Sequence, residues 1–389
     1  MTHSISNNFP CKRCVLDAVN NPEFNLDHAG LCSFCHQFDS KHLPYLQALR
    51  NGGRDEYRQV LEQIRKDGRG KRYDCLIGVS GGVDSTYIAW LTKQAGLRPL
   101  AVHFDNGWNS ELAVKNIENI IVRLGIDLET VVVDWLEFRD LQLAYLKASV
   151  VDVEVPTDHG IFTTLYRVAR RFGIRYILSG VNTATEAILP YSWIHPKLDH
   201  INLLAIHKAF GTQPLKTFPV ADFPLKRWIR RSGLQEVRIL DLIDFRKAEA
   251  EEISKRELDW HPYGGKHYES IFTRFYQGYI LPEKFGIDKR KAHLSNLICS
   301  GQMSRDEAIA ELAKPIYPQE LLREDMEFAL KKFDLTEAEF SEIMQRPRKA
   351  HRDFDFEGSI FHRFTPLKLL RPLWRKWKTG RLGNLKPWA

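Results

Sequence analysis

The sequence predicts an α/β fold, in which a doubly wound parallel sheet is joined to an N-terminal cysteine knuckle and a helical C-terminal region. Three observations predict it. Strand-like apolar segments alternate with helical patterns from residue 73 to about residue 182. A serine- and glycine-rich turn follows the first of these segments, and two Cys-x-x-Cys pairs precede them all. After about residue 240 only helical patterns continue.

The composition is that of a soluble globular protein. The chain has 389 residues, of which 43% are hydrophobic and 27% are charged. This length suffices for two domains and a small appendage. No apolar run reaches the ~18 residues of a membrane span, and the first residues lack the apolar core of a secretory signal. We therefore expect a cytoplasmic protein without a transmembrane segment.

The net charge of +7 is concentrated at the C-terminal end. Eight basic residues and no acidic residue follow Glu357, so the rest of the chain carries a net charge of −1. We therefore do not expect the part of the chain before the tail to bind nucleic acid. The tail also holds Trp374, Trp377 and Trp388. It could make a peripheral contact with an anionic membrane or an acidic partner, or pack its tryptophans on its own domain.

Four of the six cysteines form two pairs, separated by seventeen residues. They are Cys11, Cys14, Cys32 and Cys35. Two such knuckles supply four thiolates to one tetrahedral zinc, and a site with four protein ligands is structural. An iron–sulfur cluster or a disulfide pair are the alternatives, although a cytoplasmic chain rarely keeps disulfides. The neighbouring His36 is expected to be a bystander, and Cys75 and Cys299 to be buried small residues.

The expected elements follow in order. The helical pattern of residues 41–72 precedes four predicted strands, at residues 73–79, 100–104, 130–133 and 176–178. Helices are expected at residues 114–124 and 161–172, and capping boxes at Ser304 and Thr336 open two more. Parallel sheets bind ligands beyond the carboxyl ends of their strands. Here those ends are residues 80–85, 105–107 and 180–186.

Four regions are predicted from these patterns. They are a zinc knuckle at residues 1–40, an ATP-binding α/β domain at 41–240, a helical domain at 241–357 and a basic aromatic tail at 358–389.

The turn after the first strand predicts an anion-binding cradle. Ser80, Gly81, Gly82 and Ser85 lie where a strand passes into a helix, so backbone N–H groups and the helix dipole can face a phosphate. The run lacks the lysine of a Walker loop. Asp84 is the nearest carboxylate for Mg²⁺, or it simply stabilises the start of the helix.

Further basic residues follow the predicted strands in the sequence. Lys266, Lys289 and Arg290 could each contact a phosphate, or each could be a solvated charge.

The turn at residues 80–85 resembles the PP-loop of the ATP pyrophosphatase superfamily, whose members cleave ATP between the α and β phosphates. The cysteine knuckle, the segment 179–186, the segment 266–275 and residues 288–290 occur in one order around it. This combination resembles the N-acetyl sugar amidotransferase family of bacterial surface-polysaccharide biosynthesis, over about residues 9–340. The resemblance implies that an N-acetyl group of a nucleotide-activated sugar becomes an acetamidino group through an O-adenylyl intermediate.

The resemblance also implies roles for individual residues. Catalytic roles fall on Asp84, Lys266, Lys289 and Glu186, where Glu186 and Glu269 are the candidate bases. ATP would be bound by Ser80, Gly81, Gly82, Asp84, Ser85, Asp105, Gly180, Lys289 and Arg290. The sugar substrate would be contacted by Asn182, His267, Tyr268, Glu269 and Arg274.

The implied reaction consumes ammonia, and the sequence holds no recognisable glutaminase nucleophile: residue 2 is Thr2, and neither lone cysteine has the setting of a catalytic triad. We therefore expect a separate glutaminase and an ammonia-channel subunit, similar to the two subunits of imidazole-glycerol-phosphate synthase.

Two other functions compete with this one. A tRNA-modifying enzyme of the same superfamily, with thiolation as its outcome, would use the same ATP chemistry. A non-catalytic scaffold would use the tail for docking. His159 follows the third strand and could face the site, although a loop histidine is more often structural.

Overall fold

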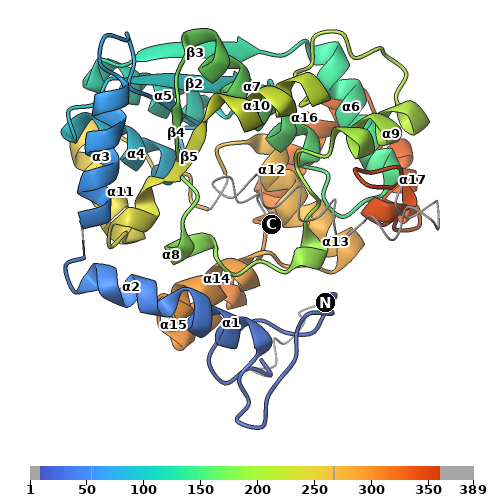
Figure 1. Cartoon of the computed structure of the whole chain (residues 1–389). Coiled ribbons are helices and arrows are strands. Elements are labelled where there is room, and N and C mark those ends of the chain that lie inside the picture. The colour runs from blue at the N-terminus through green and yellow to red at the C-terminus, as the bar shows by residue number, and fades with distance from the viewer. Residues whose placement is uncertain (1–8, 54, 266–267, 360–389) are drawn as a thin grey trace, which may run out of the picture.

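The computed structural model describes residues 9–53, 55–265 and 268–359, and it contains one five-stranded parallel sheet (Figure 1). The strand order is β3-β2-β1-β4-β5, so the chain winds outward from β1 in both directions. This confirms the doubly wound sheet. The strands are β1 (Cys75–Gly78), β2 (Pro99–Asp105), β3 (Asp127–Val132), β4 (Tyr176–Ser179) and β5 (Gln235–Arg238).

Helices cover both faces of the sheet, because the central strands bury side chains on both sides. Leu76 pairs with Ile177, and both lie in the core cluster that also contains α7 and α10 residues. Ile77 pairs with Leu178, and both point to the opposite cluster together with Ile88 of α4. Such two-sided burial is typical of parallel sheets.

The first helices run from the knuckle to β4. They are α1 (Ser33–Lys41), α2 (Leu43–Arg50), α3 (Asp55–Asp67), α4 (Val83–Gln94), α5 (Glu111–Leu124), α6 (Trp135–Ala148) and α7 (Val155–Phe172).

The remaining helices follow β4 in the chain. They are α8 (Thr183–Glu186), α9 (His200–Phe210), α10 (Phe223–Ser232), α11 (Lys247–Leu258), α12 (Ile271–Phe275), α13 (Leu281–Phe285), α14 (Arg290–Cys299), α15 (Arg305–Ala313), α16 (Gln319–Phe333) and α17 (Glu337–Gln345). Short single turns lie at Tyr191–Trp193, Ile239–Leu242, Tyr276–Ile280 and His351–Asp353. Both predicted capping boxes are present, at Ser304 and Thr336.

The N-terminal knuckle packs on the C-terminal helices. In Figure 1 it lies beside α14 and α15, at the foot of the molecule. Val15 shares a small core with Leu294 and Leu312, and its backbone N–H donates to Ser295. The two ends of the sequence are therefore joined by one core.

Several expectations were wrong in detail. The edge strand β5 was not predicted, since its four residues are only half-buried and carry polar side chains. α7 begins at Val155, so His159 lies within a helix and not in a loop. The helical prediction for residues 41–72 is confirmed, with two helices, α2 and α3, in this stretch.

The domain boundaries stay predictions, and the basic tail lies almost wholly outside the described residues. Among the residues that are described, no helix is long and apolar enough to cross a membrane.

Candidate active site

The turn after β1 forms a compact loop against the start of α4. The Gly82 N–H donates to Ser80 Oγ at 3.3 Å, and Ser85 Oγ donates to the Gly82 carbonyl at 2.9 Å. Gly82 has extended backbone angles and is the N-cap of α4, which is twelve residues long. The loop therefore ends at the positive end of a helix dipole, as an anion-binding cradle requires.

Gly81 is fixed by two aromatic side chains that the sequence analysis missed. Trp260 Nε1 and Tyr263 OH both donate to the Gly81 carbonyl, each at 2.7 Å. Asn116 of α5 donates to Tyr263 OH at 2.9 Å. The only sequence signal was the position of these aromatics just before Gly264 and Gly265.

No side chain fits at Gly81. Its φ is +83°, and a Cβ there would lie 2.7 Å from Tyr263 OH and 2.8 Å from the Ala113 carbonyl oxygen. Glycine is thus required both by the left-handed backbone and by the close approach. The cradle suits the triphosphate of ATP, because its two glycines keep Cβ atoms away from the loop backbone.

The loop after β4 forms the second wall. A Cβ at Gly180 would lie 3.6 Å from Asp84 Cβ, so the two loops meet at the start of α4. From β1 the chain adds β2 on one side of the sheet and later β4 on the other side, so the strand order reverses at this point. Open α/β sheets bind ligands at such a reversal. Asp84 lies half-buried in the first turn of α4, where it could hold Mg²⁺ beside the cradle.

Asn182 has a structural task in this wall. It is fully buried, its side chain accepts the Thr185 N–H and caps α8, and its Nδ2 donates to the Gly180 carbonyl. Glu186 ends the same helix and is half-buried. The substrate role of Asn182 and the base role of Glu186 stay predictions.

The segment around Glu269 crosses the carboxyl end of β2 and reaches the cradle. Ser110 N–H donates to the Glu269 carbonyl, and the Ile271 N–H donates to that of Trp108, both at 2.9 Å. A Cβ at Gly82 would lie 3.3 Å from Glu269 Oε1. The structure thus brings Glu269 to the phosphate-binding loop. Lys266 and His267 lie outside the described residues.

Lys289 and Arg290 are adjacent in sequence but differ in their surroundings. Burial and the nearby Lys197 lower the pKa of Lys289. Arg290 makes a forked ion pair with Asp288 and donates to the backbone carbonyls of Glu311 and Lys314. Its guanidinium is thereby occupied at the end of α15, a placement that does not favour an ATP contact.

Arg274 forms a buried, two-pronged ion pair with Asp325 of α16. The two bonds measure 2.6 and 2.7 Å, and Asp325 also accepts a hydrogen bond from Tyr317. The Arg274 guanidinium lies over the ring of Tyr268, with its central carbon 5.5 Å from the ring centroid. Arg274 therefore holds α12 against α16.

We expect Arg274→Met to lower the free energy of unfolding by about 3–5 kcal/mol, because Asp325 is left charged at 4% exposure. Denaturant unfolding measures this. The double variant with Asp325→Leu should recover most of the loss, since no buried charge remains. A stable single variant that binds substrate weakly would instead support the predicted substrate contact.

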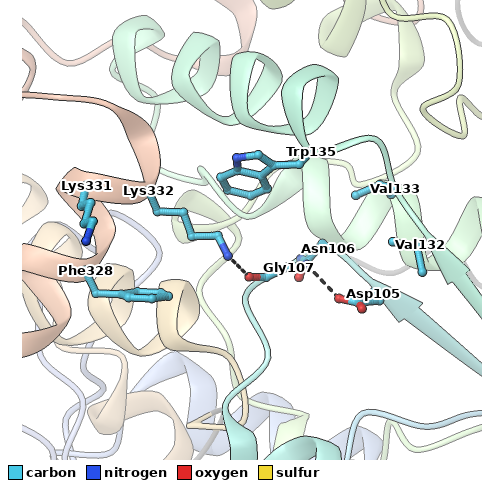
Figure 2. Close-up of a pocket in the computed structure, with 9 residues that line it drawn as sticks. All are labelled: Asp105, Asn106, Gly107, Val132, Val133, Trp135, Phe328, Lys331 and Lys332. Atoms are coloured by element: carbon cyan, nitrogen blue, oxygen red, sulfur yellow. Dashed lines mark hydrogen bonds between the residues drawn. The ribbon is translucent and has the colours of Figure 1, made fainter.

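A hollow of about 520 Å³ opens at the carboxyl ends of β2 and β3 (Figure 2). Its walls are Asp105, Asn106, Gly107, Val132, Val133, Trp135, Phe328, Lys331 and Lys332. The Lys332 ammonium donates to the Gly107 carbonyl and lies 4.6 Å from the Trp135 ring centroid. Burial lowers its pKa. Asp105, predicted to bind ATP, faces this hollow next to the cradle strand.

The four knuckle cysteines gather in one buried cluster. Their sulfur atoms lie within 4.8 Å of one another, with Cys11 and Cys35 3.8 Å apart and Cys14 and Cys32 3.5 Å apart. A tetrahedral zinc with ~2.3 Å bonds needs sulfurs about 3.8 Å apart, so the cluster fits the ion. His36 is outside the cluster and pairs with Asp27. His159 is also structural: its ring accepts the Ala221 N–H and contacts the Lys197 carbonyl.

Two family models match the chain. Residues 269–368 match the model described as LPS biosynthesis protein WbpG-like, C-terminal domain, and residues 74–190 match that of the queuosine biosynthesis protein QueC. The chain thus carries a PP-loop domain followed by a WbpG-like C-terminal domain. It is accordingly an enzyme of the ATP-utilising ligase or synthetase type, with an amidotransferase-like function.

Similar curated proteins include one that spans most of this WbpG-like chain. An uncharacterized protein of Methanocaldococcus jannaschii is 23% identical over 81% of this chain and 96% of its own length. A tRNA(Ile)-lysidine synthase of Chlamydia pneumoniae is 41% identical over 14% of this chain and 18% of its own. A glutamine-hydrolyzing GMP synthase of Pyrobaculum aerophilum is 39% identical over 19% of this chain and 14% of its own length.

Two solved structures show a partial likeness. They are an NMN synthetase from Francisella tularensis (16% identity, 55% of this chain and 72% of that one, TM-score 0.31) and an NH3-dependent NAD synthetase from Campylobacter jejuni (16%, 39% and 71%, TM-score 0.29).

Proposed function

We propose that this chain converts the N-acetyl group of a nucleotide-activated sugar into an acetamidino group, in the biosynthesis of a bacterial surface polysaccharide or flagellin glycan. The observation that carries the proposal is the position of Glu269. The WbpG-like match begins at this residue, and its carboxylate lies against Gly82 of the PP-loop. The position of this residue supports a site shared by the PP-loop and the WbpG-like segment.

The chemistry suits such a site. An amide oxygen is a poor leaving group, so AMP is first transferred to it and pyrophosphate departs. The cradle N–H groups and the α4 dipole stabilise the pyrophosphate charge, and Asp84 would hold the Mg²⁺ that neutralises it. Lys289 is the candidate cation for the α phosphate. Ammonia then attacks the carbon of the adenylyl imidate, and AMP leaves.

Three further assignments belong to the proposal. The ammonia comes from a separate glutaminase through a channel subunit. A structural zinc joins the four knuckle cysteines, as their spacing supports. The protein works in the cytoplasm, where the basic tail could touch an anionic membrane peripherally.

The test combines ATP, Mg²⁺ and ammonium chloride with UDP-linked acetamido sugars. We expect equal amounts of AMP, pyrophosphate and amidino sugar, measured by chromatography and mass spectrometry. Asp84→Asn should reduce all three at least about 100-fold, because the metal-bound pyrophosphate charge is no longer neutralised. Asp306→Asn is the matched control, since Asp306 is also acidic in a first helical turn, that of α15.

The outcomes separate the competing functions. Full activity of Asp84→Asn in a reconstituted system would favour the scaffold. Absence of AMP with every acetamido sugar would refute the amidotransferase, and tight tRNA binding with a steep salt dependence would then support the modifying enzyme.

A further inference from the structure

A group of acids and lysines surrounds the start of α7, and the reaction outlined above uses only one of its members. Lys197 Nζ lies 2.6 Å from Asp152 Oδ2 and 2.8 Å from Asp158 Oδ2. Glu154 and Lys289 are close enough for their charges to act on these groups and on each other. We call the five residues the acid–lysine cluster.

Glu154 differs from the other members because one of its oxygens is unused. The residue is 8% exposed. Its Oε2 accepts a 2.7 Å hydrogen bond from Thr273 Oγ1, whereas the buried Oε1 has no hydrogen-bond partner among the described residues. An unpaired buried carboxylate oxygen is costly, so the site is suited to a small donor that is not part of the protein.

The surroundings keep this carboxyl near a neutral-pH proton equilibrium. Burial raises the pKa of Glu154 to about 7, and Asp158 and Asp152 add to the effect. Thr273 and Lys197 oppose it. Lys289 and the Tyr276 hydroxyl also face the group, and Tyr276 donates to the Val151 carbonyl. A base with this pKa can accept and return protons at physiological pH.

The cluster lies on the ligand side of the sheet. Glu154 is the N-cap of α7, and Thr157 in the first turn accepts a hydrogen bond from Asn106 at the end of β2. Thr273, which binds Glu154, is only four positions after Glu269 at the cradle. Glu154 is thus connected through Thr273 to the segment that holds Glu269 at the cradle.

We propose that Glu154 Oε1 binds ammonia and accepts its proton during amide transfer. This inference rests on the proposed function. As NH3 adds to the imidate carbon, a C–N bond forms and the nitrogen becomes positively charged. One proton passes to Glu154 Oε1, and the C–O bond to AMP breaks with its electron pair on the AMP oxygen.

The first experiment compares variants by amidino-sugar formation and by sugar-dependent exchange of pyrophosphate into ATP. Glu154→Gln should lower product formation at least about 100-fold while exchange continues, since adenylation precedes ammonia attack. At a constant concentration of free NH3, wild-type product formation should rise with pH through about 7, and this rising limb of the pH profile should be absent in Glu154→Gln. Thr273→Val should move the limb to higher pH, because it removes a hydrogen bond that favours the charged carboxylate.

Glu137→Gln is the matched control. Glu137 is also 8% exposed, but its carboxylate accepts the backbone N–H groups of Lys216, Thr217 and Phe218. We expect an unchanged pH profile. Normal product formation by Glu154→Gln, or an unmoved limb in Thr273→Val, would overturn the assignment.

A second measurement needs no sugar. The protein is labelled with ¹³C at the glutamate carboxyls, and the Glu154 resonance is assigned as the one that Glu154→Gln lacks. We expect this resonance to titrate near pH 7. It should also shift when ammonium chloride is added, but not when sodium chloride is added. If the chemical shift of this resonance does not change when ammonium is added, the ammonia site is refuted. A response to ammonium without any amidino product would keep the ammonia site and refute the sugar substrate.

Discussion

Gly81→Ala is expected to reduce ATP-dependent AMP formation at least about 100-fold, because the PP-loop can no longer keep its shape. The added methyl group would sit 2.7 Å from Tyr263 OH and 2.8 Å from the Ala113 carbonyl, both closer than real contacts allow. The left-handed backbone at φ +83° adds strain of about 1–2 kcal/mol. We expect the free energy of unfolding to fall by about 2 kcal/mol or more. AMP release and urea unfolding measure the two effects.

Gly96→Ala is the control for backbone strain alone. Its φ is +68°, and a Cβ there would meet nothing within 4 Å. It should cost about 1 kcal/mol of stability and leave activity intact. If Gly81→Ala behaved in the same way, the close packing of the cradle would not matter for ATP cleavage.

The second large effect is expected at the knuckle. Cys14→Ser should abolish binding of the proposed structural zinc and lower the free energy of unfolding by more than about 3 kcal/mol, because metal binding and folding of such a knuckle are coupled. The consequence should spread, since Val15, the next residue, packs with Leu294 and Leu312 of the C-terminal helices. Elemental analysis gives the metal content, and denaturant titration gives the stability.

Cys299→Ala separates the metal ligands from a neighbouring thiol. Cys299 Sγ lies 3.8 Å from Cys35 Sγ and is 3% exposed, but it is not one of the four clustered cysteines. We expect this variant to keep one zinc per chain. Iron with sulfide in the wild-type protein, or oxidised cysteines without metal, would contradict the zinc assignment.

Sequence patterns predicted the central sheet well, because its inner strands are continuous apolar runs. β1, β2 and β4 are buried on both faces and were found within a few residues. β5 carries Gln235, Glu236 and Arg238 at the sheet edge, where one neighbour supplies the backbone hydrogen bonds and no apolar pattern is needed. Edge strands of this kind are recognised only by pairing.

The candidate site divides in the same way. The PP-loop and the cysteine spacing are local, so they could be predicted. The Trp260 and Tyr263 bonds to Gly81 connect residues about 180 positions apart, and nothing in the local sequence encodes them. Arg274, a substrate contact by resemblance, and Arg290, a candidate phosphate contact, pair with Asp325 and Asp288 in the fold, and their ligand roles stay predictions.

The sequence alone determined the ATP chemistry and the four-cysteine site, because both depend on residue types at short, fixed spacings. Only the tertiary structure decided which charges reach the ATP site. It brings Glu269 to the cradle and places Glu154 beside Lys289, although these residues come from three separate segments. Burial then changes their properties, as it raises the pKa of the Glu154 carboxyl to about 7.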